Sequence, residues 1–328
     1  MTFSRSATGL VAGALALALG IAPAAAQDYP NRPVTVIVPF AAGGPTDVIA
    51  RIVTDNMAKT LGQTFVIENV VGAGGTTGIT RAKRAKNDGY TIAMGHLGTQ
   101  AAAPSLYPNL QYDPVNDFEP IGLAAGTPIL ILAKKDFPAK DLKEFAAYVK
   151  ANETKVNAAH AGVGSVSFTT CLLLNSILKV KPTAVPYQGT GPSMNALVAG
   201  QVDYMCDQIV NAVPQVLGGT IKAYAIGTEE RNPSLPNVPT AKEAGMPEFQ
   251  ASAWNALIAP RGTPKAVVDK LSDALSKALD DETTRKRLLE LGSDIPGKDR
   301  RGGPALQQLV KSEIDKWSPV IKAAGPTN

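Results

Sequence analysis

Two segments of the chain share a residue pattern that is suited to holding an anion. Residues 39–46 (PFAAGGPT) and 186–193 (PYQGTGPS) both read proline, aromatic, three residues, Gly-Pro and a hydroxyl residue. In each, glycines allow a tight turn, and proline early in the following helix lacks an N–H that would have no partner there. The free amides at such a helix start bind anions. The repeat predicts two similar lobes facing a cleft, and chance recurrence of Gly-Pro turns among 25 prolines is the alternative.

Two further turns add candidate polar contacts. The glycine-rich turn at residues 161–167 precedes a helix-like run, so Ser165 or Ser167 either only caps that helix or also hydrogen-bonds a ligand oxygen. Another turn carries His96 and Thr99 after a strand-like run. Both are candidate ligand contacts, although an isolated loop histidine is usually neither catalytic nor a ligand.

Two carboxylates lie next to these turns. Asp47 falls in the first turn of its predicted helix, where it suits the positive end of the helix dipole, so a structural role and a binding role are both open. Asp207 directly follows a predicted strand, at the end where open α/β sheets bind their ligands. That position favours a role for Asp207 in holding water or a ligand ammonium group.

Alternating strand and helix patterns position these turns. Residues 33–39 form a β-branched run bounded by prolines, and residues 45–62 show helical spacing that ends at a glycine. Similar pairs recur to about residue 227, which predicts parallel sheets with helices packed on their faces. A proline-rich loop at residues 232–240 then precedes a helical C-terminus at 264–323.

Composition and absent motifs exclude several classes of protein. With 45% hydrophobic and 18% charged residues, extensive disorder is not expected, and a net charge of +4 with dispersed basic residues gives no nucleic-acid site. His96 and His160 are the only histidines, so zinc-site spacings are missing. Phosphate-loop and nucleophile-elbow motifs are absent, and residues 72–78 miss the dinucleotide fingerprint because Thr77 replaces a glycine. No metal and no cofactor are expected.

The N-terminus has the pattern of an export signal. Arg5 is followed by the apolar run 10–21 and by small residues before Gln27, which predicts a cleaved signal peptide at residues 1–26 and a periplasmic protein. No cysteine follows the cleavage site to accept a lipid, and a retained anchor helix is the alternative.

Export also changes how the two cysteines are interpreted. Cys171 lies in a helix-like run and Cys206 ends a strand-like run, so a helix-to-strand disulfide is reasonable in an oxidising compartment. Two buried thiols would give the same sequence pattern, and both alternatives are open.

Five segments together resemble a known family. They are YPNRPVTVIVPFAAGGPTD at 29–47, ENVVGAGG at 68–75, DGY at 88–90, VPYQGTGP at 185–192 and GQVD at 200–203. In these motifs and their order the chain resembles the Bug family, the extracytoplasmic solute receptors of tripartite tricarboxylate transporters. The resemblance covers essentially the whole chain after the signal.

The resemblance implies a fold and a way of binding. The fold is the two-lobed α/β type II periplasmic-binding-protein fold, with two mixed sheets flanked by helices and a ligand cleft between lobes. Lobe 1 would comprise residues 27–128 and 251–328, and lobe 2 residues 129–250. A monomer would close on a small carboxylate and present it to a membrane permease, without catalysis. The implied ligand-binding residues are Phe40, Ala41, Gly44, Thr46 and Asp47 from the first loop, His96 and Thr99 from a variable loop, and Gly164, Ser165, Tyr187, Gly189 and Asp207 from lobe 2.

The ligand class is the least specified part of the prediction. Aromatic residues make up 5% of the chain, and no arginine cluster falls in the loops. Both observations favour a linear dicarboxylate of four to six carbons, such as malate, succinate or adipate, over an aromatic acid or citrate. The alternatives are a receptor for the same ligands that signals to a sensor partner, and an exported enzyme that uses Ser165 or Asp47 on a carboxylated substrate.

Overall fold

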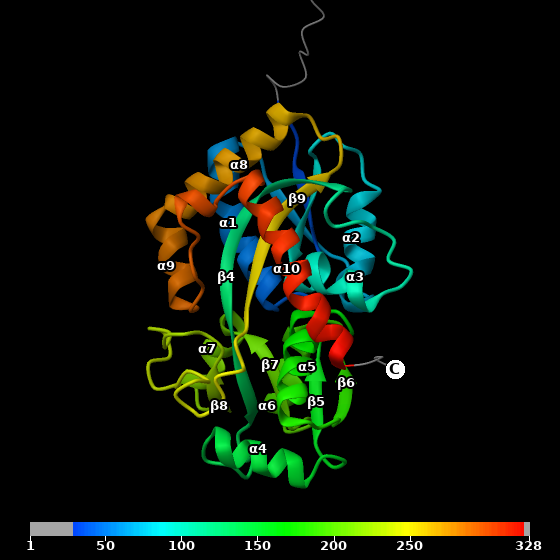
Figure 1. Cartoon of the computed structure of the whole chain (residues 1–328). Coiled ribbons are helices and arrows are strands. Elements are labelled where there is room, and N and C mark those ends of the chain that lie inside the picture. The colour runs from blue at the N-terminus through cyan, green and yellow to red at the C-terminus, as the bar shows by residue number, and fades with distance from the viewer. Residues whose placement is uncertain (1–28, 325–328) are drawn as a thin grey trace, which may run out of the picture.

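The computed structural model describes residues 29–324, and the predicted signal peptide at 1–26 lies outside them. The elements gather into two groups, which are joined by two long strands (Figure 1). These strands are β4 (Phe118–Lys134) and β9 (Ser252–Pro260), which pair with each other in antiparallel fashion. The two groups correspond to the two lobes expected from the sequence.

One group is built on a mixed sheet in the order β2-β1-β3-β9-β4. Its first three strands are parallel, and β9 and then β4 join in antiparallel fashion. The strand β1 is almost wholly buried, as its run of β-branched residues predicts. The first three strands are β1 (Val34–Val38), β2 (Phe65–Asn69) and β3 (Thr91–His96). The helices of this group are α1 (Pro45–Leu61), α2 (Thr76–Lys83), α3 (Ala103–Leu106), α8 (Lys265–Asp280), α9 (Glu282–Glu290) and α10 (Gly303–Ala324).

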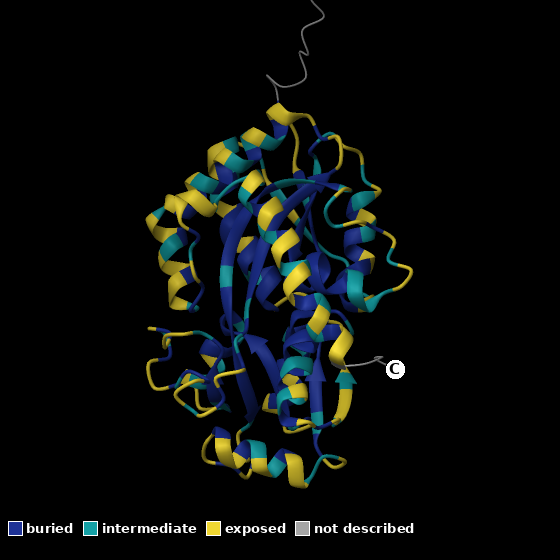
Figure 2. Cartoon of the chain, in the orientation of Figure 1, coloured by how far each residue is buried: buried dark blue, intermediate teal, exposed yellow. Residues whose placement is uncertain are grey.

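The other group uses the second half of β4. This half pairs with β7 and β8 in antiparallel fashion, and β7, β5 and β6 run parallel to one another. Its strands are β5 (Asn157–His160), β6 (Thr183–Pro186), β7 (Tyr204–Gln208) and β8 (Ile221–Ile226). Its helices are α4 (Leu142–Ala151), α5 (Val166–Leu178), α6 (Thr190–Val198) and α7 (Ile209–Leu217). The central strands are buried, whereas the edge strands β2 and β6 and the outer helix faces are partly or fully exposed (Figure 2).

The strand β4 changes partners where the two groups meet. Pro128 pairs with Ser252 of β9, whereas the next residue, Ile129, pairs with Gln208 of β7. We propose the lobe boundaries at 128/129 and 250/251 on this basis, since each sheet then belongs to one lobe.

Local sequence signals account for the helices that open toward the junction. Helix α1 has Gly44 as its N-cap and Pro45 in its first turn, and it ends at Gly62, whose φ of 69° suits glycine. Helix α5 begins after Ser165, whose side chain accepts the N–H of Phe168. The predicted strand-turn-helix units are therefore confirmed at both Gly-Pro segments and at the serine turn.

Candidate functional site

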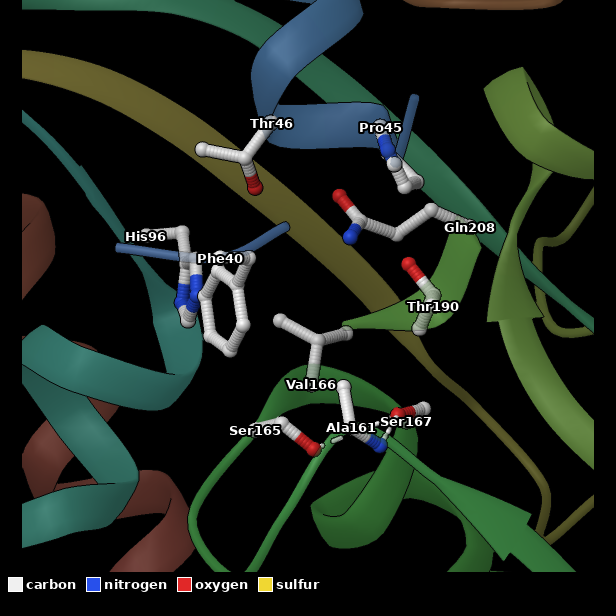
Figure 3. A pocket seen from close by; sticks show the side chains of 11 residues that line it. Phe40, Pro45, Thr46, His96, Ala161, Ser165, Val166, Ser167, Thr190 and Gln208 are labelled. Carbon is white, nitrogen blue, oxygen red and sulfur yellow. Dashed lines mark hydrogen bonds between the residues drawn. The ribbon is translucent and has the colours of Figure 1, made fainter. Parts of the chain in front are cut away.

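A small cavity lies between the two lobes. It lies against the first turns of α1, α5 and α6 and against the ends of β3 and β7 (Figure 3). The residues that line it are Phe40, Gly44, Pro45, Thr46, His96, Ala161, Ser165, Val166, Ser167, Thr190 and Gln208.

Helix N-termini, and no cationic side chains of the described residues, face the cavity. Helices α1, α5 and α6 all begin at its wall, and the first amides of a helix have no intrahelical partner. Such amides and the helix dipoles favour a negatively charged group. No lysine, arginine, aspartate or glutamate is among the lining residues of the described chain. An anionic group bound here would therefore be held by hydrogen bonds and not by an ion pair.

Asp47 organises the first loop from behind the cavity. Its carboxylate accepts a bidentate pair of bonds from Arg51, at 2.9 and 3.0 Å, and a bond from the Gly43 N–H at 3.0 Å. Asn69 Nδ2 donates both to Asp47 Oδ1 (3.0 Å) and to the Phe40 carbonyl (2.9 Å). Burial raises the pKa of Asp47, but hydrogen bonds from these donors outweigh burial and hold the pKa below its usual value. Asp47 is thus a positioning residue for the loop and does not line the cavity.

His96 reaches the cavity as a neutral ring. It stacks on Phe40 with ring centroids 4.9 Å apart, and burial lowers its pKa to about 3. Its Nδ1 accepts the Thr99 N–H at 3.2 Å, so the ring proton is assigned to Nε2, which is then a donor. Thr99 Oγ1 hydrogen-bonds the His96 backbone at 3.3 Å, and Thr99 is outside the cavity lining. Thr99 therefore positions His96.

Two serines form a hydroxyl pair on the opposite wall. Ser165 Oγ accepts the Phe168 N–H and lies 3.2 Å from Ser167 Oγ, which itself accepts the Ala161 N–H at 3.0 Å. One hydroxyl proton is used between the two oxygens, so the other hydroxyl proton is free to donate to a ligand.

Asp207 lies behind the cavity wall and not in it. Its two carboxylate oxygens accept the Gln208 N–H at 2.8 Å and Asn211 Nδ2 at 2.7 Å. Asn211 also donates to the Thr190 carbonyl at 3.1 Å. Burial raises the pKa of Asp207 to about 7. Asp207 thus lies behind two cavity residues, Gln208 and Thr190, and is not among the residues that line the cavity.

Gln208 is one of the lining residues that the sequence analysis did not name, together with Pro45, Ala161, Val166 and Thr190. It ends β7 and precedes α7, directly after Asp207. Successive side chains of a strand point to opposite faces, so the neighbour of a residue that faces away from the cavity can face into it. The alternation of side-chain direction at the end of β7 was the sequence signal that could have identified Gln208.

Other expected site residues lie where the lobes touch. The Ala41 N–H donates to the Gln188 carbonyl at 3.1 Å, and a Cβ at Gly189 would lie 3.0 Å from the Ala41 nitrogen. A Cβ at Gly164 would lie 2.9 Å from the ring of Tyr107.

Tyr107 makes a further bond between the lobes that the sequence analysis did not identify. Its hydroxyl donates to the Val163 carbonyl at 2.6 Å. Tyr187 lies along the same side, lining a second hollow with residues 72–75. Ala41, Gly164, Tyr187 and Gly189 thus border the inter-lobe contact and are not among the cavity residues.

The two cysteines lie side by side as free thiols. Cys171 of α5 and Cys206 of β7 are both buried, and their Sγ atoms are 2.7 Å apart. Their disulfide stays a prediction.

Residues 29–324 contain neither a cluster of metal-binding side chains nor a helix suited to cross a membrane. No cluster of three or more histidine, cysteine, aspartate or glutamate residues could hold a metal ion there. None of the helices described is long and apolar enough to cross a membrane.

Comparison with known proteins identifies the family. Residues 49–325 match the model of the tripartite tricarboxylate transporter family receptor. The chain belongs to this family. Its members are receptors, and the resemblance to Bug proteins is confirmed by the relatives in solved structures.

Three solved structures are similar over nearly the whole chain. MatC from Rhodopseudomonas palustris, with bound malate, is 56% identical with a TM-score of 0.88 and covers 89% of this chain and 100% of that one. The periplasmic binding protein BugD is 45% identical with a TM-score of 0.88 over 90% and 99% of the two chains. R. palustris Rpa4515, with adipate, is 32% identical with a TM-score of 0.86 over 91% and 99%. The receptor has the two-lobed periplasmic-binding-protein fold that the family resemblance implied.

Proposed function

We propose that this receptor binds a linear dicarboxylate of four to six carbons in the periplasm and, as a monomer, delivers it to the permease subunits of a tripartite tricarboxylate transporter. The observation that carries the proposal is the convergence of three helix N-termini on a cavity without charged side chains. Helix starts from both lobes allow a carboxylate to be held at each end of the ligand. The malate and adipate bound to two structural neighbours support this ligand class.

In this proposal the expected site residues divide into two groups. Phe40, Gly44, Thr46, His96 and Ser165 contact the ligand, because they line the cavity. The others hold the walls or close the lobes over the ligand; these are Ala41, Asp47, Thr99, Gly164, Tyr187, Gly189 and Asp207.

The geometry supports a receptor better than an enzyme. The hydroxyl of Ser165, the candidate nucleophile, hydrogen-bonds only the Ser167 hydroxyl and the Phe168 N–H within the described chain. A serine nucleophile needs a base within hydrogen-bond reach. Asp47, the other candidate, is bound on both oxygens by Arg51, Gly43 and Asn69.

Two single variants test the proposed contacts. Thr46→Ala and Ser165→Ala each remove a hydroxyl that could bond a charged ligand group, a loss of about 1.5–3 kcal/mol, or roughly 10- to 150-fold in Kd. Isothermal titration of each variant with malate, succinate and adipate measures this loss of affinity. Thr54→Ala is the matched control, since Thr54 Oγ1 bonds the Ala50 carbonyl of the same helix and is outside the cavity. Unchanged affinity in both site variants would show that the cavity is wrongly assigned.

A further inference from the structure

An open hollow lined by charged side chains lies on proposed lobe 1, away from the ligand cavity. It lies over the first residues of β1 and β3, the strands whose other ends lead to Phe40 and His96 at the cavity. The charged residues that line it are Arg32, Glu68, Arg81, Arg84, Lys86 and Asp88. We call it the basic hollow, because its cationic side chains outnumber its carboxylates.

Both carboxylates of the basic hollow are already paired. Asp88 accepts a bond from Arg32 at 3.2 Å, and the Arg32 guanidinium lies 3.8 Å over the Tyr90 ring. Glu68 is bound by Arg81 through two nitrogens, at 2.7 and 2.8 Å. Neither carboxylate is therefore left to neutralise the remaining cations.

Arg84 and Lys86 are these remaining cations. Both are exposed at the end of α2, and no hydrogen bond or ion pair of either side chain is found within residues 29–324. The neighbouring Lys83 differs, since it binds Asp117 at 2.9 Å. The basic hollow thus has a net positive charge, which the described residues do not neutralise.

One row of the sheet next to these cations is left uncovered. Val66 of β2 pairs with Thr35 of β1, and Thr35 pairs with Thr91 of β3, so the three side chains point to the same face. Val66 is 48% exposed, although it is a large apolar residue. An exposed apolar side chain beside arginines suits contact with a protein better than contact with a small inorganic anion.

We propose that the basic hollow docks an acidic segment of the permease subunits, whose carboxylates bind Arg84 and Lys86 and whose apolar side chain covers Val66. The inference rests on the proposed transport function and names the receptor surface that meets its partner. Glu68 and Asp88, set among the cations, disfavour a uniformly negative surface such as an anionic bilayer, because like charges brought together across an interface are costly.

The position of the basic hollow predicts how docking relates to ligand binding. Every residue that lines it belongs to proposed lobe 1. A partner bound there leaves lobe 2 free to move, so the receptor stays docked while the lobes open and close. Docking should therefore have the same affinity with and without ligand.

Charge reversal tests the proposal in transport. A strain without this receptor is complemented with the Arg84→Glu, Lys86→Glu double variant, and uptake of labelled malate, succinate and adipate is measured below saturation. Uptake should fall at least about 10-fold relative to wild type. The Kd in isothermal titration should not change, because both residues lie outside the ligand cavity.

A matched double variant controls for the change in net charge. Lys143→Glu with Lys311→Glu alters two exposed lysines, on α4 and α10, whose side chains have no partner within residues 29–324. This variant should transport as the wild type does.

Binding to purified permease subunits in phosphatidylcholine vesicles tests the contact itself. The wild-type receptor should bind them equally with and without malate, and more weakly as salt is added. The Arg84→Glu, Lys86→Glu variant should bind at least about 10-fold more weakly. Protein-free vesicles of equal parts phosphatidylglycerol and phosphatidylcholine should not bind the receptor.

Two results would overturn the inference. One is wild-type uptake by the folded double variant, and the other is binding to the protein-free vesicles as tight as to the permease subunits, which would assign the basic hollow to lipid. Both would leave the dicarboxylate proposal standing, whereas a wild-type receptor that binds none of the three acids would overturn both. If thermal unfolding shows that the double variant does not fold, Arg84→Gln with Lys86→Gln removes the charges without reversing them, and unchanged uptake would then refute the docking role.

Discussion

Gly74 is the position at which a single methyl group should prevent closure of the lobes. Its φ of 60° lies in the left-handed region, and a Cβ built there would overlap the carbonyl oxygen of Val163 and lie 2.8 Å from its carbonyl carbon. Gly74 belongs to proposed lobe 1 and Val163 to proposed lobe 2. Gly74→Ala therefore opposes contact between the lobes without placing an atom inside either core.

The expected loss follows from the bonds that depend on this contact. The same Val163 oxygen accepts the Tyr107 hydroxyl at 2.6 Å, and nearby the Ala41 N–H donates to Gln188 across the lobes at 3.1 Å. Each bond contributes a net of about 0.5–1.5 kcal/mol, so losing both weakens ligand binding by about 1–3 kcal/mol, or roughly 5- to 150-fold. The backbone strain of alanine acts in open and closed states alike and cancels in the affinity.

Gly62→Ala is a matched control. Gly62 has a similar φ of 69°, but no atom within 4 Å would meet its Cβ, and it caps α1 away from the cavity. Both variants place alanine in the left-handed region and should lose about 1–2 kcal/mol of folding stability. Isothermal titration with malate measures the loss of affinity, and thermal unfolding measures the loss of folding stability. If the Gly74→Ala variant binds malate as tightly as the Gly62→Ala variant, the claim that the lobes close through the contact between Gly74 and Val163 is refuted.

Three further predictions concern groups outside the cavity. Burial raises the pKa of Asp207 to about 7, so between about pH 4 and pH 7 the folded state binds a proton that the unfolded state does not. Folding stability therefore falls as the pH rises through this range. The Asp207→Asn variant should show a smaller fall in Tm over the same range, and a fall equal to that of the wild type would contradict this prediction. Arg51→Met removes the bidentate partner of the Asp47 carboxylate, whose pKa is held low, so Tm should fall at neutral pH and the difference should shrink as the carboxylate protonates in acid. In protein exported to an oxidising compartment, Cys171 and Cys206 should form a disulfide, so a thiol reagent in denaturant should label them only after reduction; labelling without reduction would establish two free thiols.

The elements of the fold were predictable because their signals are local. Pro45 and Gly62 bound α1, and Ser165 caps α5, each through contacts within a few residues. The paired Gly-Pro segments likewise predicted two helix starts facing a cleft. These features need only backbone geometry and capping, which a short stretch of sequence determines.

The orientation of individual site residues depended on contacts far along the chain. Asp207 and Gln208 are adjacent, and which one faces the cavity is set by the pairing of β7 with β4 and by bonds to Thr127 and Asn255. Tyr107 reaches Val163 across 56 positions, which no local pattern marks. Sequence therefore located the cavity loops but not the side chain that faces into the cavity at the end of β7.

The most direct test of the central proposal is isothermal titration of ligand-stripped protein from residue 27 onward with malate, succinate, adipate and citrate, followed by recovery of the ligand and its analysis by NMR. The proposal predicts one-to-one binding of at least one linear dicarboxylate, weaker binding of citrate, and ligand that is recovered chemically unchanged. Absence of binding to every linear dicarboxylate, or conversion of any of them to a product, would contradict it.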